Sequence, residues 1–258
     1  MVKLAVYTVL VGSNYDNLCQ PKVIDETIDY ICFVRKGSRA NGYDGIWRIE
    51  EIESEIDDNV RLSRLPKIKP HKTCLKDYDY SLYIDANIII KDVFIYDRIR
   101  ELVRNGIKIA LINHPFRDCA YQEAYVCIAG CKGAWYDILR QICYLKRSGY
   151  PNHGGLFEAN VIFRRHNEEK ITSLGERWWF LFMKYSKRDQ LSLVSAISEI
   201  GVEVEYFLPP EYSSRNHYAF ELKEHLVQRS SKKMKLRRCV VNLFRGIGRK
   251  LLKNYKKS

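Results

Sequence analysis

The chain has 258 residues, 46% of them hydrophobic, which excludes a largely disordered protein and predicts one α/β domain with a sizeable core. Its net charge of +12 lies in one region, because residues 229–258 hold 12 Lys and Arg and no acidic residue, whereas residues 1–228 hold 31 basic and 31 acidic residues. A neutral body argues against a nucleic-acid-binding domain. No apolar stretch approaches the ~18 residues that a membrane-spanning helix needs.

Apolar runs rich in β-forming residues alternate with segments of helical spacing. Strands are expected over residues 3–11, 29–34, 81–84, 107–112, 160–163 and 202–208, with another starting at 47–49 and a loop over 37–45. Helices are expected over 96–105, 168–185, 190–200 and most of 119–150. The alternation predicts an open, largely parallel sheet with helices on both faces. Such sheets bind ligands at the carboxyl ends of their strands, so 11–13 and 85–87 are candidate site loops.

The segment Ser81–Ile88 carries two oxygen-bearing side chains, Asp85 and Asn87, at the end of an apolar strand. Carboxylate and amide oxygens could hold a divalent cation that neutralises the phosphates of a nucleotide sugar. Metal-dependent glycosyltransferases use Asp-x-Asp for this purpose, and here Asn is the third residue. The alternative is an ordinary strand-ending turn, in which Asp and Asn make local hydrogen bonds.

Basic residues lie just upstream of this segment, at Arg61, Arg64, Lys67, Lys69, His71 and Lys72. Cations at these positions could bind a diphosphate. The alternative is a solvated basic helix or loop.

Three later clusters also lie near predicted strand or helix ends. The first comprises His114, Arg117, Asp118 and Glu123, which could contact sugar hydroxyls or pair with one another. In the second, Gly154 and Gly155 would let the backbone approach a ligand closely, and Glu158 enters an apolar strand pattern where a carboxylate is costly unless paired or used. Glu158 is therefore a candidate acceptor-binding residue or general base. In the third, Ser186 or Asp189 caps the next helix, or else Asp189 and Gln190 contact the sugar.

The eight cysteines include no C-x-x-C pair, and Cys127 and Cys131 are spaced as helical neighbours. Reduced, mostly buried thiols in a cytoplasmic protein are therefore expected. The apolar run at 4–11 is followed by a turn without a small-x-small cleavage site, so it is interpreted as a strand and not as a signal peptide.

Six segments, taken in order, resemble one family. They are Tyr7–Leu18, Asp29–Phe33, Ser81–Ile88, His114–Ala124, Gly154–Asn167 and, within 178–193, Trp178-Trp179 with Tyr185–Leu193. The set is similar to the TOD/MUCI-type glycosyltransferase-like family, first catalogued as a domain of unknown function, with plant members linked to seed mucilage and many bacterial members. The chain looks like a bacterial-type member, and the resemblance spans roughly residues 5–195.

The resemblance implies a GT-A-like (Rossmann-like) fold over 1–228 and transfer of a hexosyl unit from a nucleotide sugar, which we expect to be a UDP-sugar. It implies Mn²⁺ or Mg²⁺ at Asp85 and Asn87, with a late histidine, His217 or His225, as a further ligand. It also points to a reaction centre at Glu158, Arg188, Asp189 and Gln190. With the strand-end loops and the basic cluster, the expected donor-binding residues are Val11, Gly12, Ser13, Arg64, Lys67, Asp85, Ala86 and Asn87. The expected acceptor-binding or sugar-binding residues are His114, Arg117, Asp118 and Glu123.

The tail at 229–258 has its own pattern. Apolar residues fall on one helical stripe, at positions 236, 240, 243, 244, 247, 251 and 255, and Lys and Arg fill the other faces. We expect a basic amphipathic helix on an anionic membrane surface. The alternatives are a partner-binding helix or a disordered basic tail.

The sequence therefore predicts a glycosyltransferase, peripheral on the inner face of the cell membrane, that acts on a surface polysaccharide or a lipid-linked glycan. Two other classes stay open. One is a nucleic-acid-binding protein that uses the basic tail, which the neutral body disfavours. The other is a glycan or lipid hydrolase with Glu158 and Asp189 as its carboxylate pair.

Overall fold

The computed structural model describes residues 2–12, 17–40 and 42–224, so the predicted tail helix lies outside the described residues. The strands are β1 Leu4–Leu10, β2 Asp29–Arg35, β3 Gly42–Asp44, β4 Trp47–Ile52, β5 Tyr80–Ile84, β6 Ile88–Ile90, β7 Ile109–Asn113, β8 Phe157–Arg165, β9 Glu205–Tyr206 and β10 Phe220–Leu222. The helices are α1 Asn59–Ile68, α2 Phe94–Arg104, α3 Ala120–Ala129, α4 Trp135–Arg147, α5 Glu169–Lys184 and α6 Asp189–Ile200, with 3₁₀ turns at Pro70–Lys72 and Cys74–Asp77.

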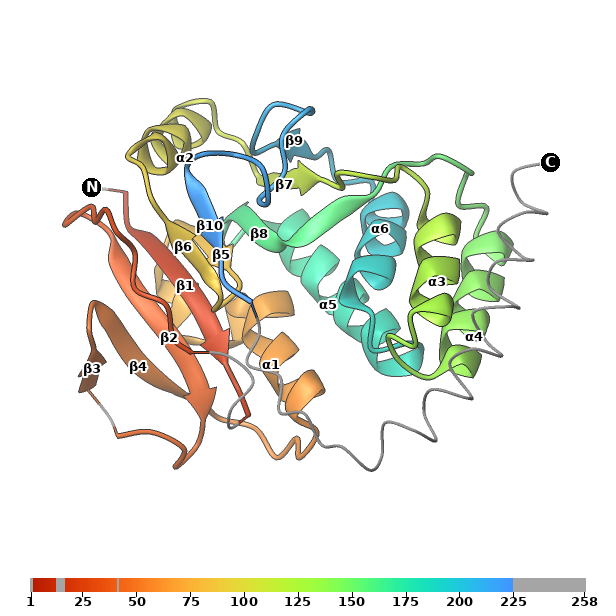
Figure 1. The fold of residues 1–258 in the computed structure, drawn as a ribbon, viewed down its shortest axis with the longest axis horizontal. Helices are drawn as coiled ribbons and strands as arrows, with labels where there is room; N and C mark the ends of the chain where they lie inside the picture. Colours follow the sequence, from red (N-terminus) through yellow and green to blue (C-terminus); the bar gives the residue numbers. More distant parts are fainter. Residues whose placement is uncertain (1, 13–16, 41, 225–258) are drawn as a thin grey trace.

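An eight-stranded sheet crosses the described molecule in the order β3-β4-β2-β1-β5-β8-β7-β9 (Figure 1). Four neighbouring pairs are parallel (β4–β2, β2–β1, β1–β5, β7–β9) and three are antiparallel (β3–β4, β5–β8, β8–β7). The predicted α/β class with a mainly parallel sheet is therefore confirmed. The strand β8 runs against both of its neighbours, which the largely parallel prediction did not include.

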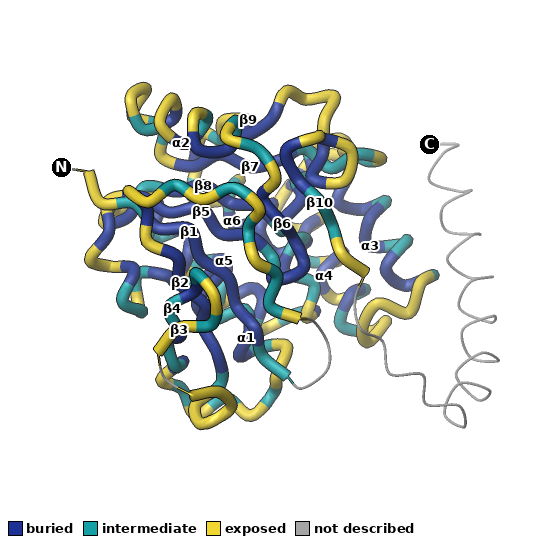
Figure 2. Tube along the Cα trace, turned by 60° about the vertical axis from the view of Figure 1, so that its left-hand side comes forward, coloured by how far each residue is buried: buried dark blue, intermediate teal, exposed yellow. Residues whose placement is uncertain are grey.

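Helices and a small second sheet cover the two faces of the large sheet. Successive residues of β1 alternate between the faces, so that Tyr7 and Val9 pack against α1, α5 and α6, while Val6 and Leu10 pack on the side of α2 and the β6–β10 pair. Since both faces are covered, the strand is apolar throughout. Figure 2 shows the central strands as the most continuously buried part of the trace.

A third apolar cluster joins α3 and α4 to the outer side of α6 (Figure 1). The predicted helical region at 119–150 is thus two helices, separated by a break at 130–134 that contains Gly130 and Gly133. Gly133 has φ +124°, which favours glycine, so the chain turns here and α4 folds back on α3.

Other element predictions were wrong in detail. The predicted loop at 37–45 contains β3, the strand expected at 202–208 is reduced to the two residues of β9, and β10 was not predicted. Neither Ser186 nor Asp189 caps α6: its N-cap is Arg188, without a side-chain capping bond, and Asp189 is the first helical residue.

The described residues test two further expectations, one on the cysteines and one on membrane-spanning helices. The seven cysteines within them form no disulfide with one another, but only three of the seven are buried, so the expectation of mostly buried thiols was wrong. Within the same residues, no helix has the length and apolar character needed to cross a membrane.

Candidate active site

The direction of the strands decides which loops meet. β5 is parallel to β1, and because β8 is antiparallel to both β5 and β7, β7 runs in the same direction as β5. The carboxyl ends of β1, β5 and β7 and the amino end of β8 therefore lie at one edge of the sheet. A pocket of about 950 Å³ opens at this edge, with α1 and α6 completing its wall.

Most of the residues singled out in the sequence line this pocket. They are Val11, Gly12, Arg64, Lys67, Asp85, Ala86, Asn87, His114, Arg117, Glu123, Glu158, Arg188, Asp189 and Gln190. Asp118 lines a neighbouring cavity instead. Ser13 and His225 lie outside the described residues.

A buried ionic network forms the α1–α6 side of the pocket. Lys67 Nζ lies 2.6 Å from Asp189 Oδ2 and 3.8 Å from Asp85 Oδ1, and Arg64 Nε lies 3.1 Å from Asp189 Oδ2. The side chains of Lys67 and Asp189 are only 3% and 9% exposed. Trp178 Nε1 also donates to the backbone oxygen of Asp189 at 2.8 Å. This network joins α1 to the first turn of α6.

The network fixes the charge of Asp189. Burial by itself would raise the pKa of this carboxyl, but the nearby charges of Lys67 and Arg64, with the hydrogen bond from Lys67, hold the pKa well below its usual range. For Arg64, burial by itself would lower the pKa. The Asp189 charge and its hydrogen bond, together with Tyr83 and Asp85, more than offset this effect, so the guanidinium stays protonated. Asp189 is thus a permanent counter-charge, which suits a positioning role and not proton transfer.

Asp85 follows β5 in a tight turn. Its backbone N–H donates to Asn160 O at 2.9 Å, and its backbone oxygen accepts from the Ile88 N–H at 2.9 Å. The Tyr83 hydroxyl donates to Asp85 Oδ1 at 2.6 Å. Burial and the neighbouring Asp85 charge raise the pKa of Tyr83 well above its usual value, so this hydroxyl remains a donor.

Asn87 is tied to the last described part of the chain. Its Nδ2 donates to Lys223 O at 2.8 Å, and the Lys223 N–H donates to Asn87 O at 2.8 Å. Among the described residues, Asp85 Oδ2 and Asn87 Oδ1 have no hydrogen-bond partner. These are hard oxygen ligands in the pocket lining, which Mg²⁺ and Mn²⁺ prefer, so the two residues fit such a cation.

His217 does not join this pair. Its ring packs among those of Phe94, Tyr212 and Tyr218, with centroids 4.9, 5.1 and 4.5 Å away. In the β6–β10 pair, Leu222 lies beside Ile88, which follows Asn87, and Phe220 lies beside Ile90. His217 comes before Phe220, so it lies at the end of β10 that is remote from Asn87. Within the described residues, no group of three His, Cys, Asp or Glu side chains could hold a metal ion.

Glu158 lies at the amino end of β8 and is 5% exposed. Its Oε2 accepts from the Ser214 N–H at 3.0 Å and from Ser214 Oγ at 2.7 Å, and Oε1 lies 3.4 Å from Arg215 Nε. Asn160 Nδ2 also donates to Ser214 Oγ at 2.7 Å. The buried carboxylate is therefore paired, as the sequence required. The sequence reasoning missed Ser214 and Arg215, which lie in a loop after Pro209-Pro210 without any strand-end signal.

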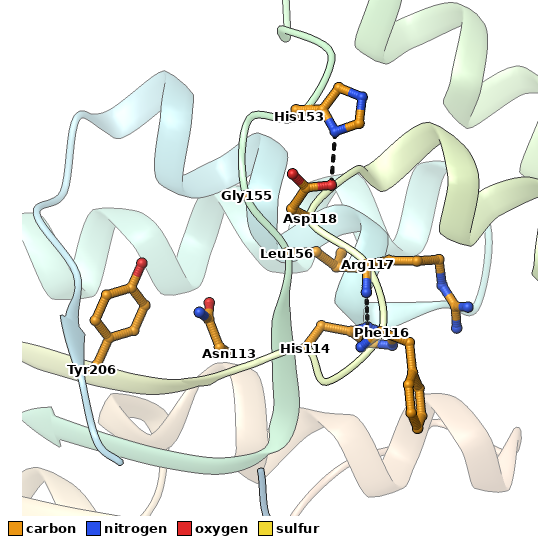
Figure 3. Close-up of a pocket in the computed structure, with 9 residues that line it drawn as sticks. All are labelled: Asn113, His114, Phe116, Arg117, Asp118, His153, Gly155, Leu156 and Tyr206. Atoms are coloured by element: carbon orange, nitrogen blue, oxygen red, sulfur yellow. Dashed lines mark hydrogen bonds and ion pairs between the residues drawn. The ribbon is translucent and has the colours of Figure 1, made fainter. Parts of the chain in front are cut away.

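The loop after β7 holds His114 as a neutral donor. Its Nδ1 accepts from the Phe116 and Arg117 N–H groups at 3.3 and 3.1 Å (Figure 3), so the ring proton must be on Nε2. Burial lowers the pKa of His114 to about 4, although the Glu123 charge opposes the shift. Arg117 Nε lies 2.7 Å from Glu123 Oε2. Arg117 and Glu123 thus pair with each other and still line the pocket.

Gln190 connects two walls of the pocket. Its Nε2 donates to Phe157 O at 2.7 Å, which joins the first turn of α6 to the start of β8.

Positive charge exceeds negative charge in the described lining, which has six Lys and Arg and four Asp and Glu side chains. Each of the four carboxylates has a cation within 4 Å. Within residues 2–12, 17–40 and 42–224, the side chains of Arg188 and Lys132 make no ion pair, and Arg188 Nε is buried without a hydrogen-bond partner. A buried donor without a partner is costly, and the half-buried guanidinium of Arg188 makes no ion pair among the described residues, so this part of the pocket suits an anionic ligand. The sequence reasoning also missed Lys132, because it lies in the α3–α4 break.

Fold and site together define an α/β protein with a net positive, polar pocket at the carboxyl edge of its sheet. The family model described as "TOD1/MUCI70, glycosyltransferase-like domain" matches residues 5–219. The chain belongs to this family and carries a glycosyltransferase-like domain, as the sequence motifs predicted.

Comparisons with individual proteins add little. No curated protein matches the chain significantly. Among solved structures, the chain is similar to the apo structure of the bifunctional glycosyltransferase WbbM, with 10% identity and a TM-score of 0.44 over 80% of this chain. The match covers 38% of that protein, so the chain spans less than two fifths of its length.

Proposed function

We propose that this protein transfers a hexosyl unit from a nucleotide sugar, a UDP-sugar in the first instance, to a surface polysaccharide or lipid-linked glycan. The observation that carries the proposal is the unpaired Arg188 in a pocket with surplus positive charge. A nucleotide sugar brings two phosphates, and its departing nucleotide develops negative charge that preorganised cations stabilise.

In this proposal Arg188 and Lys132 bind the diphosphate. Arg64 and Lys67 contribute to donor binding indirectly. Both pair with Asp189 and so fix the position of the first turn of α6, which carries Arg188 at its N-cap and Gln190. The loop at Val11 and Gly12, next to Asp85 across the parallel β1–β5 pair, contributes the nucleotide side of the donor site.

Asp85 Oδ2 and Asn87 Oδ1 would hold Mn²⁺ or Mg²⁺, which supplies positive charge to the diphosphate when bound. For the late histidine ligand we favour His225. His217 is held in its aromatic cluster, whereas His225 follows Lys223 by two residues in the sequence, and the Lys223 N–H donates to Asn87 O.

Acceptor binding is assigned to the β7–β8 side of the pocket. Oε2 of Glu158 is saturated by Ser214, so Oε1 accepts the hydrogen bond of the attacking hydroxyl, and His114 Nε2–H donates to a sugar oxygen. The basic tail at 229–258 would hold the enzyme at the cytoplasmic face of the membrane, close to a lipid-linked or surface glycan.

The hydrolase alternative is not favoured. It needs one carboxyl that gives up a proton and one free carboxylate. The low pKa of Asp189 excludes the first role, and its ion pairs with Lys67 and Arg64 do not leave it free for the second. Nucleic-acid binding has no support from the described residues beyond the surplus charge of the pocket.

The test compares the wild type with Arg188→Ala and, as a matched control, Arg104→Ala, an exposed arginine of α2. Melting shifts are measured with UDP-, GDP- and CDP-sugars in the presence of Mn²⁺, followed by donor turnover. We expect one nucleotide class to stabilise the wild type and the control, and Arg188→Ala to lose that stabilisation and ~10²-fold in turnover. If no nucleotide sugar shifts the wild-type melting temperature or is consumed, the proposed function is wrong.

A further inference from the structure

A second cavity of about 610 Å³ lies beside the main pocket and shares His114, Phe116 and Arg117 with it. Its other lining residues are Asn113, Asp118, His153, Gly155, Leu156 and Tyr206. Figure 3 shows Tyr206 and Asn113 at the left of this lining, His153 and Asp118 at the top, and His114 with Phe116 and Arg117 at the right. The two cavities therefore form one continuous surface at the sheet edge.

The lining combines aromatic rings with polar side chains. Phe116 is 74% exposed and Tyr206 39% exposed, so both side chains present ring surface to a ligand. Asn113, Asp118 and His153 add amide, carboxylate and imidazole groups. Sugars present both a flat apolar C–H face and a ring of hydroxyls, so this mixture of groups is complementary to a saccharide. Arg117 is engaged by Glu123 and Asp118 by His153, so neither charged group of the described lining lacks a partner, which favours a neutral saccharide.

The groups are held in place before any ligand binds. Tyr206 lies on the edge strand β9, and the backbone oxygens of Tyr206 and of Phe207, the residue after this strand, accept from Arg98 at 2.6 and 3.0 Å. At the other end, His153 Nδ1 lies 2.7 Å from Asp118 Oδ1, and the Gly155 N–H donates to Asp118 O at 2.9 Å. Preorganised groups lose little freedom on binding.

We propose that this second cavity is an acceptor subsite that binds a neutral saccharide unit one or more residues away from the attacking sugar, so that the acceptor is a glycan chain and not a single sugar. This inference rests on the proposed transferase function, which makes the bound saccharide part of an acceptor. Tyr206 provides the stacking face, and Asp118 and Asn113 bind hydroxyls. The volume falls within the ~300–1,000 Å³ typical of small-molecule sites.

The test is direct binding, which does not depend on turnover. Saturation-transfer NMR on the full chain uses maltotetraose, cellotetraose, mannotetraose and chitotetraose, each beside its monosaccharide. We expect at least one tetrasaccharide to bind at least tenfold more tightly than its monosaccharide. Tyr206→Ala should lower that affinity ~10-fold, and Asp118→Ala, at the other end of the cavity, should lower it as well. Tyr43→Ala serves as matched control, because Tyr43 is an exposed tyrosine of β3 at the opposite edge of the sheet.

The outcomes separate the two proposals. Loss of tetrasaccharide affinity with an unchanged nucleotide-sugar melting shift supports the subsite. Wild-type affinity in both Tyr206→Ala and Asp118→Ala, or no tetrasaccharide binding at all, overturns it. Tetrasaccharide binding without any nucleotide-sugar effect in the wild type would overturn the transferase function and leave a glycan-binding site.

Discussion

The two sides of the pocket are built differently. On the α1–α6 side, Lys67, Arg64 and Asp189 form a buried network in which every charge has a partner. On the β7–β8 side, the side chain of Arg215 is 58% exposed, and in the adjoining cavity those of Asp118 and His153 are 66% and 55% exposed. A buried network holds one geometry, as the proposed diphosphate ligand requires, whereas exposed groups on loops can be changed to suit the different glycans proposed as acceptors.

The largest effect is expected on the buried side. Lys67→Met leaves Asp189 buried with Arg64 as its only close partner, so the free energy of unfolding should fall by ~3–5 kcal/mol. Urea denaturation measures it. Lys108→Met is the control, since Lys108 pairs with Glu168 at the surface and should cost at most ~1 kcal/mol. Equal losses in the two variants would remove the distinction between the two sides.

The next effect concerns the turn at Asp85. Asp85→Ala removes the carboxylate assigned to metal and should lower donor turnover ~10²-fold, with Mn²⁺ no longer raising the melting temperature. Asp118→Ala, on the exposed side, should leave the Mn²⁺ response intact. Turnover and melting shifts with and without Mn²⁺ check this, and equal activity of Asp85→Ala and wild type would reject the assigned role.

Acidification should act through buried histidines, and the pKa of His166 is lowered further than that of His114. His166 Nε2 lies 2.8 Å from Ser81 Oγ of β5, and burial lowers the pKa of this histidine from 6.5 to about 3. Below pH 6.5 the unfolded chain therefore binds a proton that the folded chain does not, and stability falls as the pH drops towards 3. This one group should cost about 2 kcal/mol at pH 5.

His166→Gln keeps a hydrogen-bonding group but does not titrate. Its free energy of unfolding should therefore change less between pH 7 and pH 5 than that of the wild type, by about 2 kcal/mol. Denaturation at the two pH values gives the difference. An identical pH dependence in both proteins would show that the pKa of His166 is the same in the folded and unfolded chains, which would contradict the prediction.

The smallest effect on stability and transfer is expected at Ser214, which holds Glu158 on the β7–β8 side of the pocket. Ser214→Ala removes one of the two hydrogen bonds to Glu158 Oε2 and should cost about 1 kcal/mol in stability and up to ~10-fold in transfer. Ser148→Ala, an exposed serine after α4, is the control. If Ser214→Ala behaves like Ser148→Ala, then Glu158 is held by Arg215 and the backbone alone.

Local patterns in the sequence predicted the central strands of the sheet and about half of the residues that line the pocket. The apolar runs at 3–11 and 81–84 became adjacent parallel strands, and the loops after them meet because parallel neighbours end at the same edge. The family follows from ordered motifs along the chain, which need no coordinates. The surplus charge of the tail is likewise a property of the sequence alone.

Only the tertiary structure decided which charges meet. Lys67 and Asp189 are 122 residues apart, and no local pattern reveals that α1 packs against the first turn of α6. The antiparallel direction of β8 brings its amino end, with Glu158, to an edge where a parallel strand would have placed its carboxyl end. Ser214 reaches Glu158 from a loop, and His217 is drawn into an aromatic cluster away from Asn87. Periodicity and motif spacing report short-range order, whereas these contacts depend on how distant elements share a common core.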